Sequence, residues 1–296
     1  MNIAVDPRKL PALAFERSPG YWSTVLRRFA RDPVAMVAAA VVLALILLAL
    51  FGPYLTPADP YKSSMLNRLK PIGTPGFPLG TDELGRDLLS RLMVGARLSL
   101  FMGITPVLIA FAIGSAIGLL AGYVGGRVNT LIMRTIDVFY AFPSVLLAIA
   151  LSGALGAGIF NSLLSLTIVF IPPIARVAES VTTQLRSRDF VEAARASGAG
   201  AFTIVRVHVL GNALGPIFVY ATSLIAVAMI LASGLSFLGL GVKPPEPEWG
   251  LMLNTLRTAI YTQPWIAALP GVMIFITSIA FNTLSDGLRS AMDVKQ

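Results

Sequence analysis

The sequence contains no cysteine and a single histidine, His208. Disulfide scaffolds, iron–sulfur clusters and Cys–His catalysis are therefore excluded, and structural zinc sites almost so, because each needs several Cys or His ligands. The phosphate-binding pattern G-x-x-x-x-G-K-[ST] is absent as well. The chain does not cradle ATP by that route, and no ATPase activity of its own is expected.

Charge is scarce. Only 13% of the residues are Asp, Glu, Lys or Arg, where about 25% is usual in soluble domains. Apolar residues make up 55% of the chain, so there is too little polar surface to cover a globule of this size in water. The composition predicts an all-α membrane protein with several spans.

Six apolar runs have the length of about 20 residues that a bilayer requires. The first covers residues 34–51, carries no charge, and lies between Asp32-Pro33 and Gly52-Pro53. It is too long for an ordinary signal-peptide core and lacks a clear cleavage site, so it is expected to remain as an anchor. The other expected spans are 98–123, 131–153, 159–178, 213–235 and 265–284. Six spans place both termini on one side.

The net charge of +8 is explained by topology. Most Lys and Arg residues fall on the inner side if both termini are cytoplasmic, as the positive-inside rule requires. No basic stripe with interleaved aromatic residues is left over, so nucleic-acid binding is not expected. The basic residues ahead of the first span weigh most in this assignment: Arg8, Lys9, Arg17, Arg27, Arg28 and Arg31.

The outer segment, residues 53–97, is too long for a simple connector. Apolar residues recur at helical spacing near its end, which predicts an amphipathic helix on the outer surface; these are Leu84, Leu88, Leu89, Leu92 and Met93. The neighbouring charges are expected to solvate one helix face and to form pairs such as Asp87–Arg91, and substrate binding is the alternative. They are Asp82, Glu83, Arg86, Asp87 and Arg91.

The inner segment, residues 179–212, is predicted to hold a short helix. Asp189 is expected to cap it with Glu192 reaching back, and Gly198 and Gly200 are expected to end it in left-handed conformations. A helix of about nine residues is marginal alone in water. The small side chains of Ala193, Ala194 and Ala196 would fit closely into another protein's groove. Packing against the chain's own span ends is an equally open alternative.

Other candidate features are weaker. Gly114, Gly118 and Gly122 form a small-xxx-small stripe, which indicates close helix packing. Pro172-Pro173 interrupts the fourth span and predicts either a hinge or a static kink.

Arg134, Asp137 and His208 are expected to have structural roles and not catalytic ones. Snorkelling at the start of the third span accounts for Arg134 and Asp137 better than proton transfer does. His208, beside Arg206, is expected at an interface, because a metal site needs more ligands than the chain offers.

Glu192-Ala193-Ala194 is followed at fixed spacing by Gly198 and by His208-Val209-Leu210. This pattern resembles the EAA signature of permease subunits of bacterial ATP-binding-cassette (ABC) importers. Together with the runs at 78–100, 137–151 and 235–250, it is similar to the second permease of the dipeptide, oligopeptide and nickel importer group. One departure is Gly211, where the family usually has proline; Gly215 also stands where proline is common, and both predict a more flexible loop.

The resemblance implies a six-helix permease of the type I importer architecture in the bacterial inner membrane. Its parts would be a cytoplasmic segment 1–33, a first helix with external loop 34–97, a five-helix core 98–289 containing the coupling loop 179–212, and a tail 290–296. The ATPase-coupling residues would be Asp189, Glu192, Ala193, Ala194, Gly198 and His208. The implied partners are a paralogous permease, two cytoplasmic ATPases holding ATP and magnesium, an extracytoplasmic binding protein and membrane lipid. No cofactor or metal is expected on this chain.

Two other classes remain as alternatives. A secondary transporter or channel would need ionisable residues deep in its spans, and an intramembrane hydrolase would need a Ser–His or paired-Asp site at membrane depth. Neither set is evident in the sequence. Dipeptides or short oligopeptides are the first choice of substrate by resemblance, with glutathione-like peptides and nickel chelates as alternatives.

Overall fold

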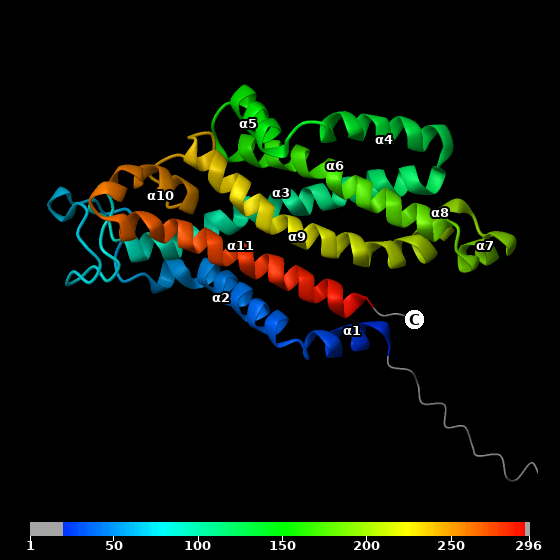
Figure 1. Cartoon of the computed structure of the whole chain (residues 1–296), viewed down its shortest axis with the longest axis horizontal. Helices are drawn as coiled ribbons and strands as arrows, with labels where there is room; N and C mark the ends of the chain where they lie inside the picture. Colours follow the sequence, from blue (N-terminus) through cyan, green and yellow to red (C-terminus); the bar gives the residue numbers. More distant parts are fainter. Residues whose placement is uncertain (1–19, 294–296) are drawn as a thin grey trace, which may run out of the picture.

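Long apolar helices running side by side dominate the computed structural model, which describes residues 20–293 (Figure 1). Within that range the secondary structure is helical apart from turns and two isolated β-bridges. The basic residues Arg8, Lys9, Arg17 and Lys295, most of the segment 1–33 and the last residues of the tail 290–296 lie outside the described residues.

The helices follow one another in a simple order along the chain. They are α1 (Tyr21–Phe29), α2 (Pro33–Leu55), η2 (Met65–Asn67), α3 (Leu88–Val124), α4 (Gly126–Tyr140), α5 (Ser144–Leu155), α6 (Ile159–Arg186), α7 (Asp189–Ala196), α8 (Ala201–Thr203), η3 (Ile204–Val209), α9 (Leu210–Phe237), α10 (Trp249–Thr255), η4 (Arg257–Tyr261) and α11 (Pro264–Met292).

The first long helix shows why the predicted boundaries hold. The Asp32 side chain accepts hydrogen bonds from the backbone N–H groups of Val34 (2.9 Å) and Ala35 (3.1 Å), which caps α2. Pro33 occupies the first helical position, where its missing N–H costs nothing. The apolar run that follows is 23 residues long, enough to cross a bilayer.

Five helical stretches of the described chain are long and apolar enough to span a membrane. The pair α4 and α5, which are bent by 85° relative to each other, passes the same test together and makes a sixth span if it is counted as one broken span. The prediction of one continuous span over 131–153 is therefore wrong. Pro143 explains the break, because it lacks an N–H and disfavours helix at the residue before it.

The amphipathic surface helix predicted in the outer segment does not exist as a separate element. Residues 88–97 are the first turns of α3, which continues without interruption for 37 residues. Leu88 and Leu92 are buried, so their helical spacing reflects packing within the bundle. Leu84 precedes the helix and is exposed.

The glycine stripe packs α3 closely against α6, as predicted. A Cβ on Gly118 would lie 2.3 Å from the carbonyl oxygen of Ala175, and one on Gly122 would lie 2.7 Å from that of Glu179. Such distances leave no room for a side chain, so the backbones of α3 and α6 are in direct contact.

The two ends of the bundle differ in character (Figure 1). One end, called the loop end below, carries residues 56–87 and α10. The other, the α7 end, carries α7 and α8. The first and last described helices also meet at the α7 end, where Arg28 Nη1 donates a hydrogen bond to the carbonyl oxygen of Asp293 (3.3 Å).

Candidate coupling segment and polar clusters

The coupling segment, residues 187–209, protrudes at the α7 end of the bundle (Figure 1). Its helix α7 has eight residues and ends in a Schellman motif. Gly198 has φ +82°, and its N–H bonds to the carbonyl of Arg195 (3.0 Å), while Ala199 N–H bonds to that of Ala194 (3.1 Å). The predicted left-handed stop at Gly198 is therefore confirmed.

Two other details of the prediction are wrong. The residue preceding α7 is Arg188, so Asp189 is the first helical residue and not its cap, and no side-chain capping bond is formed. Asp189 and Glu192 instead lie in the first turn, where their charges favour the positive end of the helix dipole. Gly200 has φ −68° and ψ 155°, an extended conformation that any residue adopts, so the left-handed conformation predicted for it is absent.

The helix α7 is anchored to its own chain by one side only. Val191 is fully buried, and the ring of Phe190 lies 6.4 Å from that of His208, centroid to centroid. Glu192 and Ala193 are exposed, and Ala194 is half-buried. The small-residue face is thus open on the outside, with the apolar side chains of Phe202 and Val207 exposed nearby.

His208 and Gly211 do not lie in a loop. His208 belongs to the π-helical turn η3, which runs directly into α9. Gly211 and Gly215 are inside α9 itself, so the prediction of a more flexible loop at these positions is wrong. The wide π turn lets the chain pass from the coupling segment into a membrane helix without a break in hydrogen bonding.

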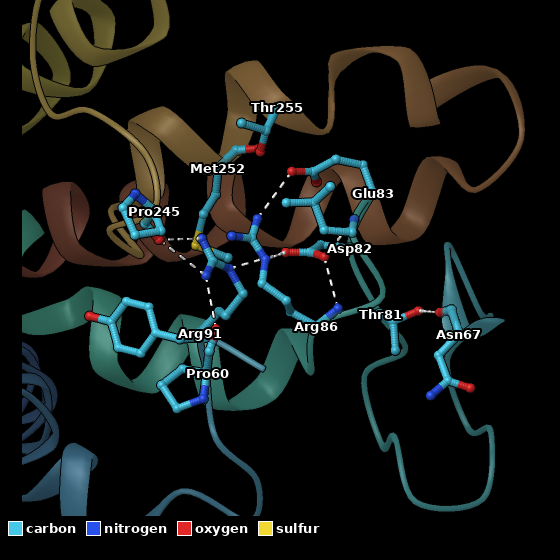
Figure 2. A network of polar contacts seen from close by, with 12 residues as sticks. Pro60, Asn67, Thr81, Asp82, Glu83, Arg86, Arg91, Pro245, Met252 and Thr255 are labelled. Carbon is cyan, nitrogen blue, oxygen red and sulfur yellow. Dashed lines mark hydrogen bonds and ion pairs between the residues drawn. The ribbon is translucent and has the colours of Figure 1, made fainter. Parts of the chain in front are cut away.

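A second polar cluster, the outer network, fills the loop end (Figure 2). The Asp82 carboxylate accepts from Arg86 Nε (2.6 Å) and pairs with Arg91 Nε (3.2 Å). Arg91 Nη1 donates to the carbonyl oxygen of Pro60 (2.9 Å), and its guanidinium also reaches that of Pro245 (3.4 Å). The network thus joins the outer loop, the start of α3 and the loop before α10.

The charges near the start of α3 are not placed as the sequence predicts. Asp82, Arg86 and Arg91 are buried and do not solvate a helix face. The expected Asp87–Arg91 pair is absent from the ion pairs of the described residues. Asp87 instead caps α3 by accepting from Ser90 N–H (2.8 Å) and Ser90 Oγ (2.6 Å).

Two glutamates at the loop end, Glu83 and Glu248, are shielded from solvent. Burial, and then the neighbouring Asp82 charge, raises the pKa of Glu83 above its usual range. Burial also raises the pKa of Glu248, even though its carboxylate accepts from the backbone N–H groups of Gly250 and Leu251 (2.8 Å each). Sequence periodicity gave no sign of Glu248, which lies in a Pro-rich loop ahead of a short helix.

A cavity of about 340 Å³ lies at the bend between α4 and α5. It is lined mainly by aromatic and apolar residues, among them Tyr140, Phe142, Tyr220 and the two prolines Pro172 and Pro173. Helix α6 passes through both prolines without ending, and their role as a hinge stays a prediction.

The charges near this cavity are paired differently from the expectation. Asp137 forms an ion pair with Arg176 of α6, and Arg134 lies farther off, at 3.8 Å. Arg134 is largely exposed, and snorkelling of these two side chains stays a prediction. Across residues 20–293, no group of three or more His, Asp or Glu side chains is placed to hold a metal ion.

Comparison with known proteins agrees with this arrangement. Residues 114–295 match the family described as "Binding-protein-dependent transport system inner membrane component", and residues 20–71 match the N-terminal transmembrane domain of oligopeptide transport permease C. The chain belongs to this permease family. It is a multi-pass inner-membrane subunit of an ABC importer.

Two relatives of this permease are similar over nearly their whole length. The glutathione transport system permease protein GsiD of Pectobacterium atrosepticum is 42% identical over 93% of this chain and 91% of its own. The di/tripeptide transport system permease protein DppC of Pseudomonas aeruginosa is 40% identical over 98% of this chain and 96% of its own.

A solved structure supports the fold of the permease. An inward-facing structure of the MetNI methionine ABC transporter matches with a TM-score of 0.56 at 19% identity, over 68% of this chain and 95% of that chain. The type I importer permease architecture is thereby confirmed. Permeases of this kind act with ATPase and substrate-binding partners.

Proposed function

We propose that this permease forms one half of the translocation pathway of an ATP-driven importer of short peptides. The observation that carries the proposal is the similarity, over 98% of the chain, to a permease whose name gives di- and tripeptides as its cargo. Glutathione, named for the other relative, is itself a tripeptide and is a second candidate of the same chemical class.

We place the α7 end in the cytoplasm and the loop end outside. The basic residues Arg27, Arg28 and Arg31 precede the first span, and Arg186, Arg188 and Arg195 flank or lie in α7, as the positive-inside rule favours for a cytoplasmic side. The outer network then supports a surface that faces the binding protein.

The coupling segment is proposed to dock on a cytoplasmic ATPase. The exposed surface of α7 and of the turn that ends it offers Ala193 and Gly198, neither of which projects beyond a methyl group. Phe202 and Val207 expose apolar surface beside it. A short helix of this kind would move as a rigid body when the ATPase closes. ATP and magnesium would be held by that partner, and this chain would bind no cofactor of its own.

We also propose a paralogous second permease as an obligate partner, together with two ATPases and an extracytoplasmic binding protein. A single bundle of six spans, one of them bent, does not enclose a path for a peptide by itself, so a second subunit is needed to complete the path. The lipid-facing side is provided by apolar side chains such as Leu43 and Leu47 of α2, which are exposed in the isolated chain.

The test is uptake of radiolabelled dialanine, trialanine and glutathione into proteoliposomes that contain the chain, its partner permease, the ATPases and the binding protein. ATP-dependent uptake of at least one of the three is expected, and it should be lost when any one subunit is omitted. Uptake that persists without ATP, or transport by the chain without a second permease, would contradict the proposal.

A further inference from the structure

The Asp137–Arg176 ion pair joins two candidate membrane spans, α6 and the bent pair α4–α5. Arg176 is ten residues before the end of α6, about 15 Å along the axis, and Asp137 lies within the broken span formed by α4 and α5. Even so, the side chains remain 37% (Asp137) and 48% (Arg176) exposed in the isolated chain. A charged pair on membrane-spanning helices is costly to expose to lipid, which favours a surface that borders water or protein.

The pair adjoins the cavity at the α4–α5 bend. Asp137 is one helical turn before Tyr140, and Arg176 is one turn after Pro173, and both of these neighbours line the cavity. The Arg176 guanidinium also lies 5.4 Å from the centre of the Tyr140 ring, a cation–π contact that orients it. In Figure 1, α4, the bend and α5 lie along one side of α6.

The chemistry of the pair favours one kind of ligand. A neutral ligand gains nothing by separating a cation from an anion, and a singly charged ligand would leave one partner uncompensated. A zwitterion with a carboxylate at one end and an ammonium at the other can replace each partner at once. The cavity, at about 340 Å³, is within the range of small-ligand pockets. Its aromatic and proline lining offers no charged group that would select particular side chains of a peptide.

We propose that Asp137 and Arg176 exchange their mutual ion pair for the two charged termini of a passing peptide: Arg176 takes the carboxylate and Asp137 takes the ammonium. The inference rests on the proposed import of peptides and adds a specificity site inside the permease. Because the resting pair competes with the peptide, the contact is weak and reversible, which suits a path that must release its cargo.

Paired neutral substitutions distinguish this role from a structural one. Dialanine uptake is measured in the full importer with Asp137→Asn, Arg176→Gln and the double variant, alongside ATP hydrolysis stimulated by the binding protein. We expect each single variant to lower uptake about tenfold or more, the double variant to be no better, and the stimulated hydrolysis to persist. Arg176→Lys, which keeps the cation, should recover part of the uptake.

A purely structural pair predicts the opposite pattern. Each single variant would leave an unpaired charge, and the double variant, which leaves none, would restore uptake to within about twofold of wild type. That result would overturn the inference. Arg127→Gln, an exposed arginine at the start of α4, is the matched control and should leave uptake unchanged.

A second measurement does not require the charge variants to assemble. Because the chain has no cysteine, Ser144→Cys places a single thiol of this subunit in the cavity lining with the ion pair intact. We expect a hydrophilic methanethiosulfonate to label it, and millimolar dialanine to slow that labelling more than N-acetyl-dialanine amide does. No labelling, or equal protection by both compounds, would count against the site.

The outcomes also separate this inference from the proposed function. A wild-type importer that takes up none of the tested peptides contradicts peptide import itself. Wild-type uptake of dialanine combined with normal uptake by the double variant leaves peptide import standing and rejects only the termini-binding role of Asp137 and Arg176.

Discussion

Single residues hold the loop end together through buried carboxylates that accept several hydrogen bonds each. Asp82 accepts from two backbone N–H groups, those of Leu84 and Arg86, besides its two arginine side chains. Glu248 does the same at the start of α10, and its Oε1 also accepts from Ser99 Oγ of α3 (3.3 Å). Glu248 therefore joins α10 to the distant helix α3, whereas Asp82 organises its own turn and the start of α3.

Removing one such carboxylate should loosen the loop end measurably. Glu248→Ala deletes the cap of α10 and leaves the buried N–H groups of Gly250 and Leu251 without an acceptor. We expect a loss of about 2 kcal/mol or more, seen as a lower midpoint of thermal unfolding of the purified permease in detergent. Glu246→Ala, which removes only an exposed bond from Tyr61 Oη, is the control and should change the midpoint little.

Among single residues, the turn at Gly198 could be predicted from the sequence, whereas the burial of the charges at the loop end could not. Gly198 was predictable, because a glycine following an alanine-rich helix has a specific backbone role. The burial of Arg91 was not, because the carbonyl groups that it contacts come from Pro60 and Pro245, which are far away in the sequence. Helical spacing of charges indicates a solvent-exposed face, and only the tertiary structure shows whether another segment covers that face.

At the scale of elements, the direct backbone contact between α3 and α6 leaves no room for side chains at the contacting glycines. Gly118→Ala would place a methyl carbon 2.3 Å from the Ala175 carbonyl oxygen, which belongs to backbone and cannot rotate away. We expect a destabilisation of about 1–3 kcal/mol from overpacking and a reduced yield of monodisperse permease on size-exclusion chromatography. Gly153→Ala in α5, where nothing lies within 4 Å, should show the normal yield.

Element prediction worked where apolar length alone decides. The expected first span, 34–51, differs from α2 (Pro33–Leu55) only at the ends. The local sequence determines both its start, at Asp32-Pro33, and the length of its apolar run. The α4–α5 break was missed, although Pro143 was visible, because hydropathy averages across a bend of 85°. The outer amphipathic helix was a wrong reading of residues that pack inside the bundle.

At the scale of the whole molecule, the orientation in the membrane remains a prediction that fusions can test. Reporters near residue 205 and after Gln296 should read cytoplasmic, and reporters near residues 70 and 247 should read external. The expectation follows from the cluster of arginines near α1 and α7 and the positive-inside rule. A cytoplasmic signal at residue 70 would contradict the six-span topology.

The central claim is that the coupling segment transmits the work of the ATPases to the permease. Its face is open, its helix is short, and Gly198 has φ +82° with nothing within 4 Å of a Cβ placed there. A side chain at that position therefore strains the backbone by about 1 kcal/mol or more without clashing inside this chain, so a further loss of function would come from the partner. Glu192→Ala removes no capping hydrogen bond, so its effect on uptake should be smaller.

The most direct measurement compares Gly198→Leu with Gly126→Leu. Gly126 also has a positive φ (+54°) and open surroundings, but it is the first residue of α4, outside the coupling segment. Recovery of the ATPase subunits with the purified permease and peptide uptake by the full importer are measured for both. We predict that Gly198→Leu lowers both quantities about tenfold, and that Gly126→Leu leaves them near wild type. If Gly198→Leu retains ATPase recovery and uptake at the wild-type level, the coupling segment is only a connector.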